Sequence, residues 1–201
     1  AGGGVIQSEC YTRRQGAARR LTPRPTFMPG AKSRAGSGAR DKASPAIVRS
    51  VDNLRAAVAG FHQDGHHVAL VPTMGALHSG HMALVAAASE AAARTVVSIF
   101  INPIQFAPTE DLAAYPRNDE EDLRKLSDAG VDLVFMPTAG EMYTAGFGTT
   151  VNVAGPGVGL ESAARPQFFT GVATVVCKLL LQCLPDIAVF GEKDYQQLQV
   201  V

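Results

Sequence analysis

The stretch HVALVPTMGALHSGHMALVAAASEAAA, residues 67–93, decides the fold. The apolar run His67–Val71 predicts a short strand buried on both faces, and the Ala-rich run Gly80–Ala93 predicts a helix. Between them lies a turn that carries two histidines, His78 and His81. A strand, a turn and a helix in this order are typical of one unit of a parallel sheet.

The same alternation of short apolar runs and helical patterns continues on both sides of this stretch. Helices are predicted at Val51–Phe61, Asp119–Ala129 and Gly171–Leu184, and strands at Thr95–Ile101, Val131–Met136, Thr149–Val153 and Asp186–Phe190. Doubly apolar strands that alternate with helices indicate a parallel sheet covered on both faces. With right-handed crossovers, the expected fold class is α/β, a Rossmann-like doubly wound parallel sheet that spans residues 46–201.

Residues 1–45 differ in composition from the rest of the chain. They hold nine Lys or Arg residues against Glu9 and Asp41, and they show no sustained apolar periodicity. Such a segment buries too little apolar surface to fold, so we expect a disordered basic leader. Its Arg-rich, acid-poor composition is typical of an organellar transit peptide, and sequence outside the native start is the alternative.

The bulk composition excludes several classes of protein. The formal net charge is zero and no run of about eighteen apolar residues occurs, so no membrane span is predicted. The three cysteines, Cys10, Cys177 and Cys183, lack metal-ligand spacing, which favours a reducing compartment and predicts no metal site. We expect a cytoplasmic protein, or an organellar one if the leader is a transit peptide.

A nucleic-acid partner is not expected. The basic leader is not matched by a basic patch with aromatic residues in the predicted folded part. A non-catalytic nucleic-acid module driven by the leader is nevertheless the alternative from another functional class, and its binding would be weak and sensitive to salt.

The turn between the first strand and its helix predicts a phosphate site. In doubly wound sheets ligands bind beyond the carboxyl ends of the strands. His78 and His81 are three residues apart and lie on one side of the first helical turn, where free backbone N–H groups favour an anion. Gly80 allows close approach of a phosphate. The alternative is an ordinary helix cap beside a surface histidine, and the absence of Gly-Lys-Ser/Thr excludes a Walker loop.

Polar residues also follow the second and the last strands. Gln105 lies among apolar neighbours, and its amide can donate to a carboxylate and accept from a hydroxyl, as a hydroxy acid requires. Asn102 precedes a proline, so a plain turn is its alternative role. Lys193 falls in a first helical turn, an unfavourable place for a cation unless an anion binds there too, and Gln197 shares its helical face.

Five ordered motifs resemble the pantothenate synthetases. They are PTMGALHSGH at 72–81, FINPIQF at 100–106, YPR at 115–117, RPQFFTGV at 165–172 and GEKDYQQ at 191–197. The resemblance covers roughly residues 47–201. It implies ATP-dependent ligation of pantoate to β-alanine through a pantoyl adenylate, giving pantothenate, AMP and pyrophosphate, with Mg²⁺ neutralising the triphosphate.

The resemblance also implies roles for particular residues. The ATP-binding set is Met74, Gly75, Ala76, Leu77, His78, Ser79, Gly80, His81, Gly191, Glu192, Lys193 and Asp194. His81 is expected to be catalytic, with His78 and Lys193 on the phosphates. Gln105 and Gln197 are expected to hold pantoate, with Asn102 and Tyr115 as further substrate contacts. Asp194 either touches Mg²⁺ or caps a helix.

Two departures from the family pattern leave alternatives open. Phe168 stands where many members carry His, and the family's Ser-rich loop and C-terminal domain would follow Val201, so an inactive fragment is one alternative. Another is a nucleotidyltransferase that adenylates a different metabolite. A phosphate-bearing acceptor would call for Arg or Lys where Gln105 and Gln197 stand. The expected partners are pantoate, β-alanine and ATP, and the oligomeric state stays open, a homodimer included.

Overall fold

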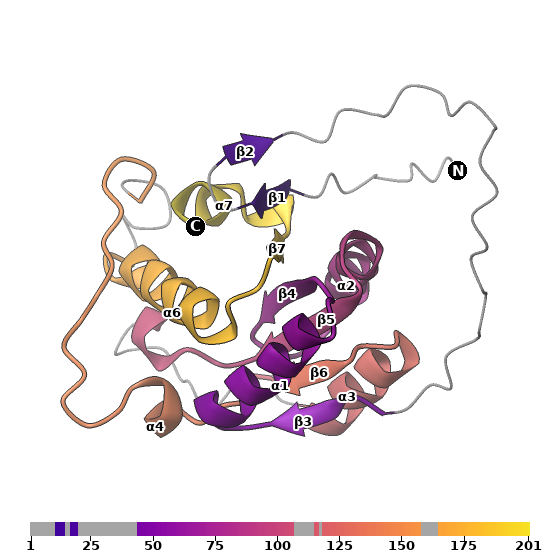
Figure 1. Cartoon of the computed structure of the whole chain (residues 1–201). Coiled ribbons are helices and arrows are strands. Elements are labelled where there is room, and N and C mark those ends of the chain that lie inside the picture. Colours follow the sequence, from indigo (N-terminus) through magenta and orange to yellow (C-terminus); the bar gives the residue numbers. More distant parts are fainter. Residues whose placement is uncertain (1–10, 15–16, 20–43, 107–114, 117, 158–164) are drawn as a thin grey trace.

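A computed structural model of the chain describes residues 11–14, 17–19, 44–106, 115–116, 118–157 and 165–201 (Figure 1). Within these residues, five strands run parallel in the spatial order β7-β4-β5-β6-β3. They are β3 (Ala46–Val48), β4 (Val68–Thr73), β5 (Arg94–Ile99), β6 (Leu133–Phe135) and β7 (Ile187–Phe190). This order confirms the predicted Rossmann-like α/β fold.

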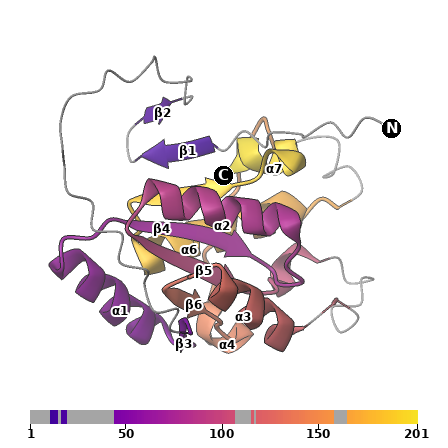
Figure 2. The ribbon, with the colours of Figure 1, turned by 90° about the vertical axis from the view of Figure 1, so that its right-hand side faces the viewer.

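Helices cover both faces of the sheet, so the central strands β4, β5 and β6 are buried on two sides. The longer helices are α1 (Val51–Gln63), α2 (Ser79–Ala91), α3 (Asp119–Asp128) and α6 (Phe168–Cys183). Along β4, Val68 and Leu70 join the core cluster that includes α1 and α6, while Ala69 and Val71 join the one that includes α2 and α3. Figure 2 shows α2 in front of the sheet and α6 behind it. The period of two explains why these strands read as continuous apolar runs.

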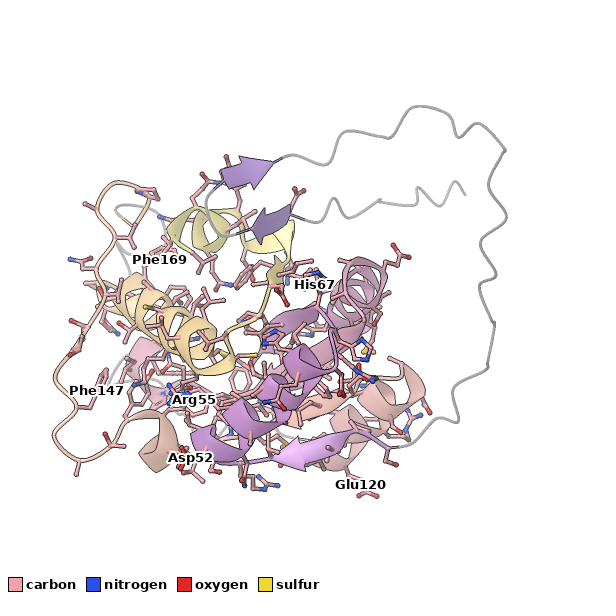
Figure 3. The ribbon with its side chains drawn as sticks, in the orientation of Figure 1. Asp52, Arg55, His67, Glu120, Phe147 and Phe169 are labelled. Carbon is pink, nitrogen blue, oxygen red and sulfur yellow. The ribbon has the colours of Figure 1, made fainter. Side chains whose placement is uncertain are left out.

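Short elements complete the carboxyl edge of the sheet. They are η1 (Pro103–Gln105), α4 (Ala139–Met142), η3 (Glu192–Asp194) and α7 (Tyr195–Val200). The side chains drawn in Figure 3 fill the space between the strands and the surrounding helices. The loops after β4, β5 and β7 thus stand on a packed core, which is the support that a binding site needs.

Two elements differ from the sequence expectations. Thr149–Val153, predicted as a strand, forms no regular secondary structure. Its Val151 and Val153 pack on α6 and α7, and the N–H of Val151 donates to Oγ1 of Thr174 (2.9 Å), so packing on a helix replaces strand pairing. Conversely, β3 was not predicted, because three residues at a partly exposed sheet edge give too short a pattern.

Two short strands lie within residues 1–45. They are β1 (Tyr11–Arg14) and β2 (Ala17–Arg19), and β1 pairs antiparallel with β7 at the sheet edge. The expectation of disorder for this segment did not include these strands. The remainder of the leader up to residue 43 lies outside the described residues, and the boundary near residue 45 stays a prediction.

At the amino ends of the parallel strands, the same hydrogen-bonding arrangement of an aspartate occurs twice. Asp132 precedes β6 and exchanges hydrogen bonds with Thr95: its N–H donates to the Thr95 carbonyl (3.1 Å) and its Oδ2 accepts the Thr95 N–H (2.8 Å). Asp186 precedes β7 and exchanges the same pair with Val68, at 2.9 and 2.8 Å. Each aspartate therefore fixes its strand in register with the neighbouring strand.

In the part of the chain that the structure describes, no helix combines the length and the apolar character needed to cross a membrane.

Candidate functional site

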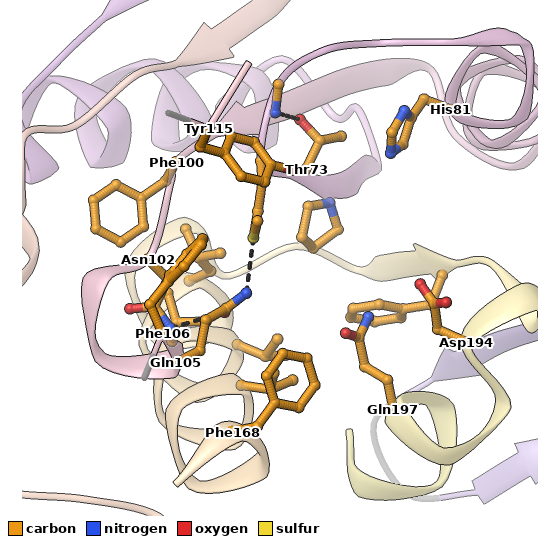
Figure 4. Close-up of a pocket in the computed structure, with 18 of the residues that line it drawn as sticks. Thr73, His81, Phe100, Asn102, Gln105, Phe106, Tyr115, Phe168, Asp194 and Gln197 are labelled. Carbon is orange, nitrogen blue, oxygen red and sulfur yellow. Dashed lines mark hydrogen bonds between the residues drawn. The ribbon is translucent and has the colours of Figure 1, made fainter. Parts of the chain in front are cut away.

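A pocket of about 470 Å³ opens at the carboxyl ends of β4, β5 and β7 (Figure 4). This is the place where doubly wound sheets bind ligands. Half of the residues predicted for the site line it: Met74, Gly75, His81, Asn102, Gln105, Tyr115, Asp194 and Gln197. In Figure 4 Gln105 lies on one side of the pocket and Gln197 on the other, as the prediction of a shared substrate requires.

The remaining predicted residues lie next to the pocket without lining it. They are Ala76, Leu77, His78, Ser79 and Gly80 in the turn after β4, and Gly191, Glu192 and Lys193 after β7. His78, Ser79, Gly80, Glu192 and Lys193 are exposed. The predicted Tyr-Pro-Arg motif is only partly described, because residue 117 lies outside the described residues. The functional roles assigned to all these residues stay predictions.

The turn after β4 adopts an unfavourable backbone conformation. Gly75 and Ala76 have φ angles of 84° and 50°, and a left-handed Ala costs of order 1 kcal/mol. A side chain at Gly75 would also meet Asp122 Oδ2 and Ile99 Cγ2, both at 3.3 Å. The sequence therefore needs glycine at 75 for both conformation and space.

Helix α3 holds this turn in place. Oδ1 of Asp122 accepts the N–H of Leu77 (2.7 Å), and Nζ of Lys125 donates to the carbonyl of Leu77 (2.7 Å). Asp122 is 1% exposed, and its Oδ2 finds no hydrogen-bond partner among the described residues. Sequence reasoning missed both residues. The available signal was that Asp122 precedes the apolar Leu126 by four residues and thus shares its buried helical face.

His78 and His81 form the start of α2. Nδ1 of His78 accepts the N–H of Gly80 (3.1 Å), Nδ1 of His81 accepts the N–H of His78 over a long 3.4 Å, and the two rings lie 4.1 Å apart between centroids. His78 is therefore the helix cap that the alternative reading proposed. His81, by contrast, faces the pocket.

The protonation state of His81 follows from its surroundings. Burial and, next, the neighbouring His78 lower the pKa of His81, and the carboxylate of Asp122 raises it only in part. A neutral ring whose Nδ1 accepts a hydrogen bond carries its proton on Nε2. His81 can therefore offer an N–H donor to an oxygen in the pocket, as a phosphate site requires.

Asn102 and Gln105 form one buried amide network. Nδ2 of Asn102 donates to Oε1 of Gln105 (3.0 Å) and to the carbonyl of Gly171 (3.1 Å), and Nε2 of Gln105 donates to Sδ of Met74 (2.9 Å; Figure 4). Oδ1 of Asn102 accepts from the hydroxyl of Tyr143 (2.6 Å). Asn102 thus lies buried behind Gln105 and does more than form a turn, while its expected contact with a substrate stays a prediction.

Helix α6 supplies the apolar floor of the pocket. Val172, Val175, Val176 and Leu179 line it from one face of the helix. Gly171 brings α6 against η1 so closely that a Cβ there would lie 2.7 Å from Cα of Gln105. Phe168 lines the pocket beside Arg165, whose guanidinium lies 5.3 Å from its ring centroid. Phe168 and Arg165 are further lining residues to which the sequence reading assigned no role.

The carboxylates near the pocket do not form a metal cage. No three His, Cys, Asp or Glu side chains come together as ligands anywhere in the described ranges. Asp194 lines the pocket at the N-cap of α7, and its side chain makes no capping hydrogen bond there. The helix-capping alternative for Asp194 is therefore not what the structure shows.

Comparison with known proteins gives one consistent result. The family model described as pantoate-beta-alanine ligase matches residues 46–201. The pantothenate synthetase of Mesorhizobium japonicum is 60% identical over 157 residues, which are 78% of this chain and 56% of the relative. That of Paramagnetospirillum magneticum is 60% identical over 155 residues, 77% of this chain and 55% of the relative.

Solved structures agree with the sequence relatives. A pantothenate synthetase from Thermus thermophilus has a TM-score of 0.72 at 51% identity, over 77% of this chain and 55% of that one. A pantoate-beta-alanine ligase from Francisella tularensis, complexed with beta-gamma ATP and beta-alanine, has a TM-score of 0.71 at 31% identity, over 78% and 60%. The chain thus spans about half the length of the curated relatives it matches.

Proposed function

Because the chain belongs to the pantoate-β-alanine ligase family, we propose that it provides the ATP- and pantoate-binding part of an enzyme that joins pantoate to β-alanine. The observation that carries this proposal is the meeting, in one pocket, of the His81 turn with Gln105 and Gln197. The His81 turn is suited to bind phosphate oxygens, and the two glutamines are suited to bind a hydroxy acid through uncharged hydrogen bonds. The relative from Francisella tularensis, complexed with beta-gamma ATP and beta-alanine, supports ATP and β-alanine as two of the substrates.

The proposed reaction has two steps. A carboxylate oxygen of pantoate attacks the α-phosphorus of ATP, a P–O bond forms, and the bond to pyrophosphate breaks. The amine of β-alanine then attacks the acyl carbon of the adenylate, a C–N bond forms, the bond to AMP breaks and the amine loses a proton. Neither step needs a protein nucleophile, so the pocket acts by aligning groups and stabilising charge.

Each side chain has a proposed task in the first step. The Nε2–H of His81 donates to the oxygens of the reacting phosphate, where negative charge grows. His78 caps the helix that carries His81, and the exposed Lys193 is the residue proposed to bind the terminal phosphates. Gln105 and Gln197 hold pantoate, and Tyr115, stacked edge-on against Phe106 (5.8 Å), closes that side of the pocket.

Mg²⁺ fits this pocket only as a companion of ATP. Mg²⁺ is commonly held by one or two carboxylates together with substrate phosphates and waters. Asp194, a pocket-lining carboxylate without a capping bond, is the residue that we propose would hold it. Bound there, the ion would neutralise charge on the triphosphate.

Titration calorimetry tests the proposal and its rival together. The chain is titrated with Mg-ATP, with pantoate and with 4-phosphopantoate, a matched acid that carries a phosphate. Binding of Mg-ATP and pantoate, with weaker binding of the phosphorylated acid, is the expected result, because Gln105 and Gln197 are neutral and give no counter-charge for a phosphate at the positions they hold. Preference for the phosphorylated acid would instead favour a nucleotidyltransferase that acts on a different metabolite.

A further inference from the structure

Tyr143 does not line the pocket, yet it bonds directly to the network that does. It is the C-cap residue of α4, and its hydroxyl lies 2.6 Å from Oδ1 of Asn102. Burial raises the pKa of Tyr143, so the hydroxyl keeps its proton and acts as the donor in this bond. Asn102 is only 1% exposed, so its Oδ1 depends on partners within the protein.

The contacts of Asn102 fix the direction of every amide in the network. The carbonyl of Gly171 can only accept, so the Asn102 atom 3.1 Å from it is the Nδ2 donor. Tyr143 therefore meets Oδ1, and the same Nδ2 group meets Oε1 of Gln105. Gln105 is left with Nε2 facing Met74 and the pocket (Figure 4).

This direction decides what the Gln105 side of the pocket can bind. A thioether sulfur is a weak acceptor, so a ligand oxygen can replace Sδ of Met74 as the partner of Nε2 at little cost. The ligand group there must be an acceptor, such as a carboxylate or the lone pair of a hydroxyl. The sequence expectation that Gln105 both donates and accepts is thereby narrowed, because Oε1 is turned toward Asn102.

We propose that Tyr143 is a positioning residue: acting through Asn102, it holds Gln105 as a hydrogen-bond donor toward the oxygens of pantoate. The identity of the ligand rests on the proposed function. The orientation of Gln105 does not, because the network is complete without any ligand.

The decisive variant is Tyr143→Phe, which removes the hydroxyl and keeps the ring. It leaves Oδ1 of Asn102 without its donor, so only the carbonyl of Gly171 still orients the Asn102 amide and Gln105 is held less firmly. The dissociation constant for pantoate should rise roughly five- to thirtyfold, while that for Mg-ATP stays within about twofold. A merely structural role would weaken both ligands together.

Phe147→Leu is the matched control. Phe147, labelled in Figure 3 on the loop after α4, packs on the ring of Tyr143 with centroids 5.0 Å apart and does not line the pocket. The Phe147→Leu substitution disturbs the packing around Tyr143 but keeps the hydroxyl of Tyr143. Its pantoate affinity should therefore stay within about twofold of the wild type. A loss equal to that of Tyr143→Phe would assign the effect to packing and overturn the proposal.

A measurement without ligand separates this proposal from the proposed function. In the wild-type chain, the side-chain amide protons of Gln105 should show a nuclear Overhauser effect to the methyl group of Met74, and Tyr143→Phe should weaken it. If the variant does not fold, the wild-type signal still decides the orientation, and its absence overturns the proposal. Failure of the wild type to bind pantoate would reject the proposed function. The nuclear Overhauser effect would still test the orientation of Gln105, because it needs no ligand. Unchanged amide signals and unchanged pantoate affinity in the folded variant would overturn the role of Tyr143.

Discussion

The amino end and the carboxyl end of the sheet both carry buried or half-buried aspartates, but they use them differently. At the amino end, both carboxylate oxygens of Asp132 and of Asp186 accept hydrogen bonds, from strand backbone and from neighbouring basic side chains. At the carboxyl end, Asp122 has one oxygen bonded to the turn after β4 and one without a partner among the described residues.

This difference separates the two tasks of the sheet. The amino end joins strand to strand and leaves little polar capacity for a ligand. The carboxyl end opens on the pocket. It contains Ala76 in a left-handed conformation and Gln105, whose Nε2 donates only to the sulfur of Met74 among the described residues. Strain and weakly used hydrogen-bonding groups are typical of functional sites. Changes at the carboxyl end should therefore alter function, and changes at the amino end should alter stability.

The largest effect is expected from His81→Ala. It removes the N–H donor that we propose binds the reacting phosphate, and loss of one such donor costs about 10²-fold or more in rate. The capping bond lost with it is a long 3.4 Å contact, so the melting temperature should change little. Pyrophosphate release from ATP and pantoate, measured with the family's C-terminal part joined to the chain, together with a thermal melt, checks both statements. Release near the wild-type rate would remove His81 from the chemistry.

Gln105→Ala is the next test of the carboxyl end. It removes the donor that we propose faces pantoate, and loss of a hydrogen bond to a charged group costs about 1.5–3 kcal/mol, or about ten- to a hundredfold in affinity. The affinity for Mg-ATP should stay nearly unchanged. Calorimetric titration with each substrate measures the split, and an effect confined to ATP would place Gln105 elsewhere.

The sequence alone predicted the main strands and helices, but it did not predict every residue that supports the site. The strand-turn-helix pattern at 67–93 predicted β4 and α2 because apolar runs report burial directly. The pattern also indicated which loops meet at the carboxyl edge. It did not indicate Asp122, Lys125 or Tyr143, because their roles depend on contacts between segments more than twenty residues apart. The helical period places Asp122 on the buried face of Leu126, but no periodic signal shows which distant groups these three residues contact.

Asp186→Ala tests the amino end, where stability and not ligand affinity should respond. It leaves the N–H of Val68 without its partner, which costs about 1–3 kcal/mol of unfolding free energy. Urea unfolding at pH 7 measures this loss, and the affinity for Mg-ATP serves as the control. A variant with normal stability but weakened ATP binding would contradict the division between the two ends.

Asp186 should also make the stability of the fold depend on pH. Partial burial by itself would raise the pKa of Asp186, but the N–H of Val68 and the side chains of His67 and His62 lower it below its ordinary value of 3.8. A carboxylate whose pKa is lowered by folding stabilises the fold at pH values above its pKa in the unfolded chain. This contribution disappears as the pH falls through its pKa in the folded protein. Wild-type stability should thus decline below about pH 4, and Asp186→Ala should show less of that decline.

The smallest effect is expected from deleting residues 1–45. The deletion removes β1 from the edge of β7, but β7 keeps its parallel pairing with β4. The segment has few apolar residues, so the melting temperature and the affinity for Mg-ATP should hardly change. A drop of several degrees would show that the edge strand belongs to the fold.

Gly171 has a consequence for genetics. A Cβ at this position would lie 2.7 Å from Cα and 2.8 Å from N of Gln105, which are atoms that every amino acid possesses. No exchange of the side chain at 105 can make room for it. A selection for second-site suppressors of Gly171→Ala should therefore recover no compensating substitution at 105, although the two residues touch.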